Sequence, residues 1–174
     1  FLQAMASPIR RLQLTPFYSY DFPHPADWDV DWVGGDPPAS RMEHPVSNIP
    51  FPAARRFAWW AGKRLPTSQE WEKAARGIDG RAFPWRQGED EPRADARRVF
   101  LVPVDSFPEL ASPYGVLHLT SNVREWTATR PREAWRVMRH GSYADDARTP
   151  AHEVADAQER WMMLHLGFRC GRSI

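Results

Sequence analysis

The stretch GKRLPTSQEWEKAARG, from Gly62 to Gly77, carries the signals of one short helix and of both its ends. Thr67 is a favourable N-cap residue, and Glu70 follows it three positions later, which is the spacing of a capping box. Gly77 supplies the left-handed residue that commonly ends a helix. The apolar stripe of this helix consists of Trp71, Ala74 and Ala75. We therefore expect a capped helix that buries its tryptophan.

A second helix is predicted immediately upstream. Pro52 suits a first helical turn, and Gly62 provides a stop. The apolar face that we expect this helix to bury comprises Ala53, Phe57, Trp60 and Ala61. Elsewhere the pattern predicts short strands separated by turns and irregular loops, the longest loops being 21–45 and 141–160. The expected strands cover 10–20, 99–104, 121–127, 134–138 and 164–170, with a further short strand inside 141–160.

Further motifs follow in a fixed order: FPW (83–85), PVDSFPELASPYGVLHLTSNVREWT (103–127), RVMRHGSY (136–143) and GFRC (167–170). With the opening stretch, this series resembles the formylglycine-generating-enzyme-like (sulfatase-modifying-factor) domain, over roughly 9–170. The resemblance implies an α+β fold: a C-type lectin fold of the formylglycine-generating-enzyme type, with two helices, small antiparallel sheets and long irregular loops. We expect a single domain over 1–174.

Composition excludes several classes of function. The formal net charge of +1 provides no global field for nucleic acid, and no apolar run approaches a membrane span. The Arg pairs at 55–56 and 97–98 are interpreted as solvated faces diluted by acidic neighbours. No signal peptide is visible in the sequence as given, and localisation is left open. The preference for Arg over Lys fits a GC-rich genome and, more weakly, a thermostable protein.

Thiol catalysis is the first chemistry to weigh. The enzymes that this chain resembles oxidise a substrate cysteine through copper. Two of their own cysteines bind the copper, between an RGGSW motif, which corresponds to RHGSY (139–143) here, and the GFR motif. Here the single cysteine is Cys170, after the GFR motif, where we expect a buried structural thiol. We therefore predict that the protein is not an enzyme. The alternative is a metal-dependent oxidase or a degenerate sulfatase-modifying-factor enzyme.

Metal binding receives little support from the ligand types. No pair among the six histidines has the spacing of a zinc site. The resembling enzymes hold structural calcium near a GNVWEW motif, which corresponds to SNVREW (121–126) here, with Asn or Asp where this chain has His118. Ser121 replaces a usual Gly, although Glu125 is retained. Calcium prefers oxygen ligands, so we predict no cofactor and regard structural calcium as weakly supported.

A binding surface is the remaining hypothesis. In the resembling family, the region between the RGGSW-like and GFR motifs is exposed, and here its last part is apolar. Exposed apolar side chains commonly mark interfaces, although period-2 alternation could instead bury part of 161–166 in the core. We expect a protein or cell-surface ligand, with no nucleic acid and no membrane insertion. The predicted ligand-binding residues are Tyr143, Asp145, Asp146, Arg148, His152, Trp161, Met163 and His165.

A narrower resemblance concerns the variable proteins of diversity-generating retroelements, which use this fold as a display scaffold. Adenine-specific mutagenesis of Asn codons rewrites their segment before GFR. In the corresponding segment, 140–166, residues such as Tyr143, Asp145, His152 and His165 fit the outcomes that such codons permit. Glu153, Gln158, Glu159, Trp161, Met162 and Met163 do not fit them. The pattern is compatible with a diversified binding protein and with a divergent ordinary member of the family.

Overall fold

The computed structural model describes residues 2–3, 39–85, 101–139, 154–161, 163 and 165–172. The expected strand at 10–20 lies outside these residues. The helices are α1 (Phe51–Trp60) and α2 (Ser68–Arg76), with 3₁₀ turns η3 (Ala39–Arg41) and η5 (Pro108–Leu110). The strands are β1 (Leu2–Gln3), β2 (Arg124–Trp126), β3 (Trp135–Arg139), β4 (Val154–Gln158), β5 (Leu166–Phe168) and β6 (Cys170–Gly171). Neither described helix has the length and apolar character needed to cross a membrane.

Helix α2 has the capping box that the sequence predicts. The Thr67 side chain accepts a hydrogen bond from the Glu70 backbone N–H, and the Glu70 carboxylate accepts one from the Thr67 N–H at 2.8 Å. Gly77 ends the helix with φ +66°, as expected, although its ψ of −147° lies outside the left-handed helical region. A Cβ at Gly77 would lie 2.9 Å from Pro113 Cγ, so close approach also favours glycine here.

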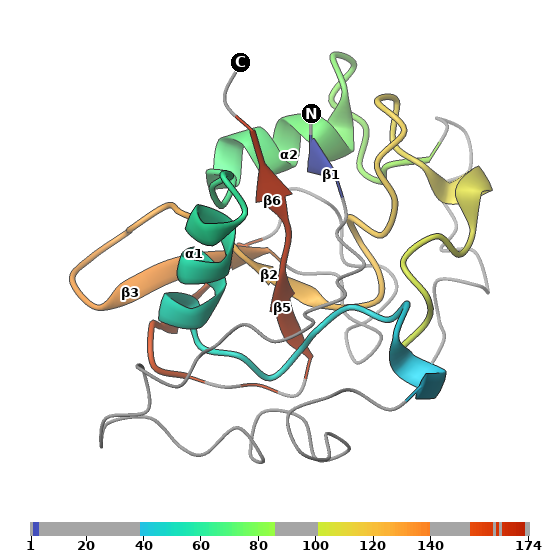
Figure 1. Ribbon diagram of the computed structural model, residues 1–174. Helices are drawn as coiled ribbons and strands as arrows, with labels where there is room; N and C mark the ends of the chain where they lie inside the picture. Colours follow the sequence, from blue (N-terminus) through green and yellow to red (C-terminus); the bar gives the residue numbers. More distant parts are fainter. Residues whose placement is uncertain are drawn as a thin grey trace.

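Helix α1 begins as predicted, with a proline in its first turn, but of its predicted buried face only Phe57 is buried. The residues that it buries are Phe51, Ala54, Phe57 and Ala58. Trp60, expected inside, is 62% exposed. The helix turns this face inward because Phe57 packs edge-to-face on Phe168 of β5, with ring centroids 5.5 Å apart. Figure 1 shows α1 running alongside β5 and β6.

The main sheet is mixed and has the order β4-β3-β2-β5; a separate two-stranded sheet pairs β1 with β6. The β2–β3 and β3–β4 pairs are antiparallel, whereas β2 and β5 are parallel, with Arg124 opposite Leu166 and Trp126 opposite Phe168. This parallel pair corrects the expectation of purely antiparallel sheets. It arises because β5 enters on the far side of β2 from β3, after the chain has passed through β4.

The strand expected at 99–104 does not form over its described part, 101–104. The Asn122 side chain meets the backbone of Val102 instead. Its Oδ1 accepts from the Val102 N–H at 3.1 Å, and its Nδ2 donates to the Val102 carbonyl at 3.0 Å. A side-chain amide thus satisfies both backbone groups that a neighbouring strand would otherwise pair.

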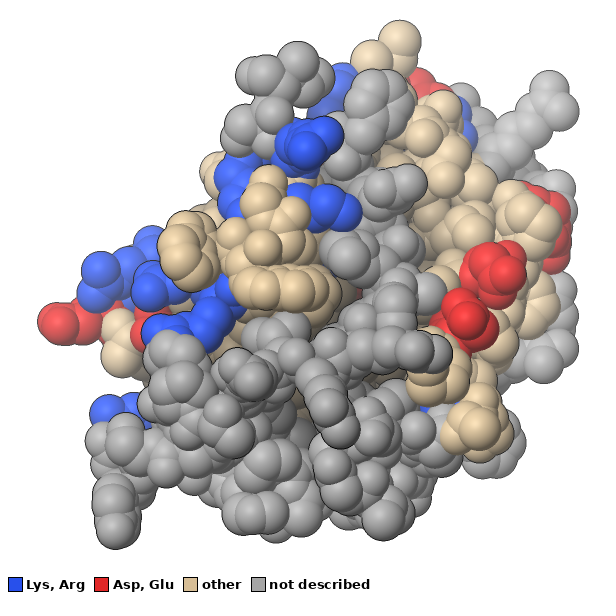
Figure 2. Space-filling model, in the orientation of Figure 1, with Lys and Arg blue, Asp and Glu red and all other residues tan. Residues whose placement is uncertain are grey.

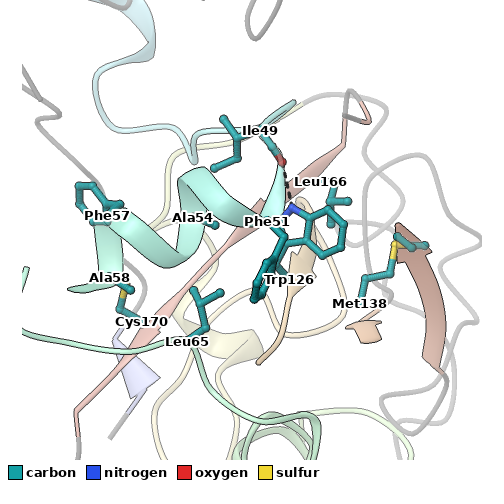
Figure 3. Packing of buried hydrophobic residues seen from close by; sticks show 11 residues of the cluster. Ile49, Phe51, Ala54, Phe57, Ala58, Leu65, Trp126, Met138, Leu166 and Cys170 are labelled. Carbon is teal, nitrogen blue, oxygen red and sulfur yellow. Dashed lines mark hydrogen bonds between the residues drawn. The ribbon is translucent and has the colours of Figure 1, made fainter. Parts of the chain in front are cut away.

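The core is built around tryptophans, and the predicted burial of Trp71, Trp85 and Trp126 is confirmed. Figure 3 shows the largest cluster, where Trp126 packs edge-to-face on Phe51 at 5.9 Å and donates from Nε1 to the Ile49 carbonyl at 2.9 Å. The ring therefore buries its area without leaving its polar atom unsatisfied. Trp71 centres a second cluster beneath α2, and Trp85 a third, smaller one.

Arg139 connects the sheet to α2 at the end of β3. Its side chain is almost fully buried and donates from Nη2 to the Ser68 carbonyl at 2.6 Å and to Glu72 at 2.9 Å. Its guanidinium also lies over the Trp71 ring, with Cζ 5.3 Å from the centroid. Burial lowers the pKa of Arg139 from its ordinary value, while hydrogen bonding to Glu72 opposes that effect. Arg139, which belongs to the RVMRHGSY motif, therefore has a structural role in joining β3 to α2.

Candidate functional site

The carboxylate of Glu125 is the centre of a buried polar network. It accepts from Trp71 Nε1 at 2.7 Å and from Arg169 Nε and Nη2 at 2.6 and 2.5 Å. Arg169 Nη2 also donates to the Leu117 carbonyl at 3.1 Å and lies 3.5 Å from the His118 carbonyl. This network joins α2, β2 and the residue between β5 and β6, and its ionic members are well paired.

His118 lies beside this network as a neutral imidazole. Burial, with a smaller effect of the nearby Arg169 guanidinium, lowers the pKa of His118 to about 4. Its Nδ1 lies 3.1 Å from Ser121 Oγ, and its backbone has φ +58°. The two positions that differ from the resembling enzymes therefore contact each other. The contact with Ser121 places the His118 imidazole inside the loop rather than in a solvent-facing site.

The residues at this position do not fit a structural calcium ion. Such an ion would need hard oxygen ligands, here the Glu125 carboxylate and neighbouring carbonyls. Arg169 and Trp71 already engage both carboxylate oxygens, and Arg169 engages the Leu117 carbonyl. Among the described residues, no group of three or more His, Cys, Asp or Glu side chains could hold a metal ion. The Arg169 guanidinium therefore supplies the positive charge beside the Glu125 carboxylate and the Leu117 carbonyl.

Cys170 is a structural thiol, as the sequence predicts. Its residue is 1% exposed and belongs to the main core cluster. Figure 3 shows its sulfur beneath Ala58 of α1. Burial raises the pKa of Cys170 to about 11, so the thiolate needed for nucleophilic attack or metal binding is disfavoured. As the single cysteine of the chain, it does not fit a copper site made from two cysteines.

Of the eight residues predicted to bind ligand, three lie among the described residues. Tyr143, Asp145, Asp146, Arg148 and His152 lie outside the described residues. Of the other three, Trp161 is exposed at 43%, Met163 is partly buried against the main core cluster, and His165 is half-buried. The backbone carbonyl of His165 accepts from Arg124 N–H at 2.7 Å, which ties this residue to β2. The structure thus presents Trp161 at the surface and turns Met163 toward the core.

Trp161 packs against a second tryptophan, a contact that the sequence analysis did not predict. Its ring packs edge-to-face on Trp135 at the start of β3, with centroids 5.5 Å apart. The Arg132 guanidinium lies over the other ring at 3.9 Å and pairs with Asp156 of β4 at 3.5 Å. We refer to Arg132, Trp135, Asp156 and Trp161 as the Trp161 surface. Trp135 was foreseen only as a strand residue, because no local pattern indicates which distant ring it meets.

Comparison with known proteins adds sequence and fold relationships. The model of the sulfatase-modifying factor enzyme 1-like domain matches residues 18–174. The chain is 35% identical over 153 residues to "Inactive C-alpha-formylglycine-generating enzyme 2" of Bos taurus, covering 75% of this chain and 50% of that protein. It is 38% identical over 107 residues to the formylglycine-generating enzyme of Mycobacterium tuberculosis, covering 52% and 35%. The chain thus spans half or less of the length of these curated relatives.

Two solved structures share the fold at low sequence identity. PvdO from Pseudomonas aeruginosa matches with a TM-score of 0.66 and 19% identity, covering 76% of this chain and 63% of that chain. Treponema denticola variable protein 1 matches with a TM-score of 0.57 and 17% identity, covering 86% and 77%. Together with the two helices and small mixed sheet, these matches show the α+β fold expected from the sequence.

Proposed function

The chain belongs to the sulfatase-modifying factor enzyme 1-like domain family, and within it we propose that this protein is a non-enzymatic binding member. Its ligand is a protein or a cell-surface structure. The binding surface comprises the Trp161 surface together with residues of the segment 140–166. Trp161 carries the proposal: it is a large exposed ring held in place by a second ring, in the part of the chain where the sequence predicts binding.

The chemistry of the Trp161 surface supports recognition. Tryptophan and arginine are the residues that most often dominate binding energy at interfaces. Trp135 packs against the exposed Trp161 ring and restricts its orientation, so less conformational entropy is lost when that ring is covered. Arg132 lies over Trp135 and pairs with Asp156, which places charged groups beside the two rings. The surface therefore combines apolar contact area with charged groups that make directional hydrogen bonds.

The thiol of this chain argues against the enzymatic alternative. A formylglycine-forming mechanism of the kind that the family resemblance implies requires reactive cysteines. Cys170 is buried, has a raised pKa, and is the only cysteine in the chain. The relatives do not decide between the two functions, since one is named inactive and another is named as an enzyme.

We further propose that the segment 140–166 is diversified, as in retroelement variable proteins. Two observations support this reading: the fold shared with Treponema denticola variable protein 1, and the permitted residue types at Tyr143, Asp145, His152 and His165. A near-identical template repeat beside a reverse-transcriptase gene would support diversification. A genomic neighbourhood without either would contradict it, and would leave the binding proposal to be judged separately.

The binding proposal is tested by capturing biotinylated cell-surface proteins on the immobilised chain. A triple variant, Tyr143→Ala, His152→Ala and Trp161→Ala, should lose specific capture while its melting temperature stays nearly unchanged. The matched control is Ile78→Ala, which removes an apolar side chain that is 89% exposed elsewhere on the surface. Equal capture by the triple variant and the wild type would contradict the proposal.

A second assay addresses the enzymatic alternative directly. The protein is incubated with copper(I) or iron(II), oxygen and a cysteine-containing sulfatase-type peptide, and the peptide is analysed by mass spectrometry. We expect the peptide cysteine to remain unconverted. Catalytic formation of formylglycine would overturn the non-enzymatic assignment.

A further inference from the structure

We draw no further inference here: the strongest candidate, the surface patch over helix α1 where the rings of Trp59 and Trp60 are 78% and 62% exposed among Lys and Arg side chains (Figure 2), is an apolar face for which nothing in the described part of the chain shows what covers it.

Discussion

Glu125 and Arg169 form an ion pair in the interior, although 44 positions separate them in the chain. Their side chains are only 5% and 3% exposed, and two hydrogen bonds of 2.6 and 2.5 Å join them. The pair joins β2 to the residue that links β5 and β6, and it engages the oxygens that a calcium ion would require. Several predictions about stability depend on this arrangement or on groups close to it.

Removal of one partner should be costly. We expect Glu125→Gln to lower the free energy of unfolding by about 3–5 kcal/mol, because it leaves the buried guanidinium uncompensated. Arg64→Gln, which breaks the exposed Arg64–Glu70 pair, should cost less than about 1 kcal/mol. Urea denaturation followed by circular dichroism measures both values. A similar small loss in the two variants would show that the buried pair has no special structural role.

Calcium should not affect stability. Because Trp71 and Arg169 already bind the oxygens of the Glu125 carboxylate, an added ion finds no free oxygen ligands at this site. We expect the melting temperature to be the same in millimolar calcium chloride as in EDTA. Any ligand that binds the folded state selectively would raise it. A reproducible, concentration-dependent rise with calcium, and none with magnesium, would contradict this expectation.

Stability should fall when the solution is acidified through the range of His118. In the unfolded chain this imidazole gains its proton near pH 6.5, whereas in the folded protein its pKa is about 4. The unfolded state therefore binds more protons between these values, so the stability present above pH 6.5 is lost progressively toward pH 4. The loss is on the order of 2–3 kcal/mol. His118→Gln should flatten the curve of unfolding free energy against pH over this window, and an unchanged curve would refute the assignment.

Gly167 should tolerate no side chain. A Cβ at this position would lie 2.4 Å from the Val46 carbonyl oxygen and 3.3 Å from Val123. Because the close neighbour is backbone, relief would require a shift of β5 or of the 46–49 segment. We expect Gly167→Ala to cost more than about 2 kcal/mol, measured by chemical denaturation. Gly62→Ala is the control: it has open space and only a positive φ, so about 1–2 kcal/mol is expected.

Cys170 should react slowly with thiol reagents in the native protein. Its burial and its raised pKa of about 11 both lower the concentration of accessible thiolate. Cys170→Ser should reduce stability modestly, because a hydroxyl would enter the apolar cluster beneath α1, and it should leave ligand capture intact. Labelling kinetics with and without denaturant provide the measurement. Native labelling at the rate of a free cysteine would disprove the burial.

The sequence alone determined features whose causes are local. The capping box of Thr67 and Glu70 forms between residues three positions apart, so no distant contact is needed to specify it. Burial of Trp71 and Trp126 also followed from the sequence, since these large rings sit within motifs that carry the family resemblance. The thiol of Cys170 was likewise placed correctly in the core.

Tertiary structure decided everything that depends on which distant segments meet. The direction in which α1 faces is set by Phe168, more than a hundred positions away, and that choice leaves Trp60 in solvent although its periodicity allowed burial. The parallel pairing of β2 with β5 and the Trp135–Trp161 contact depend equally on the path of the chain. Local sequence propensity does not indicate such pairings, because these contacts stabilise the protein only once the distant segments are packed together.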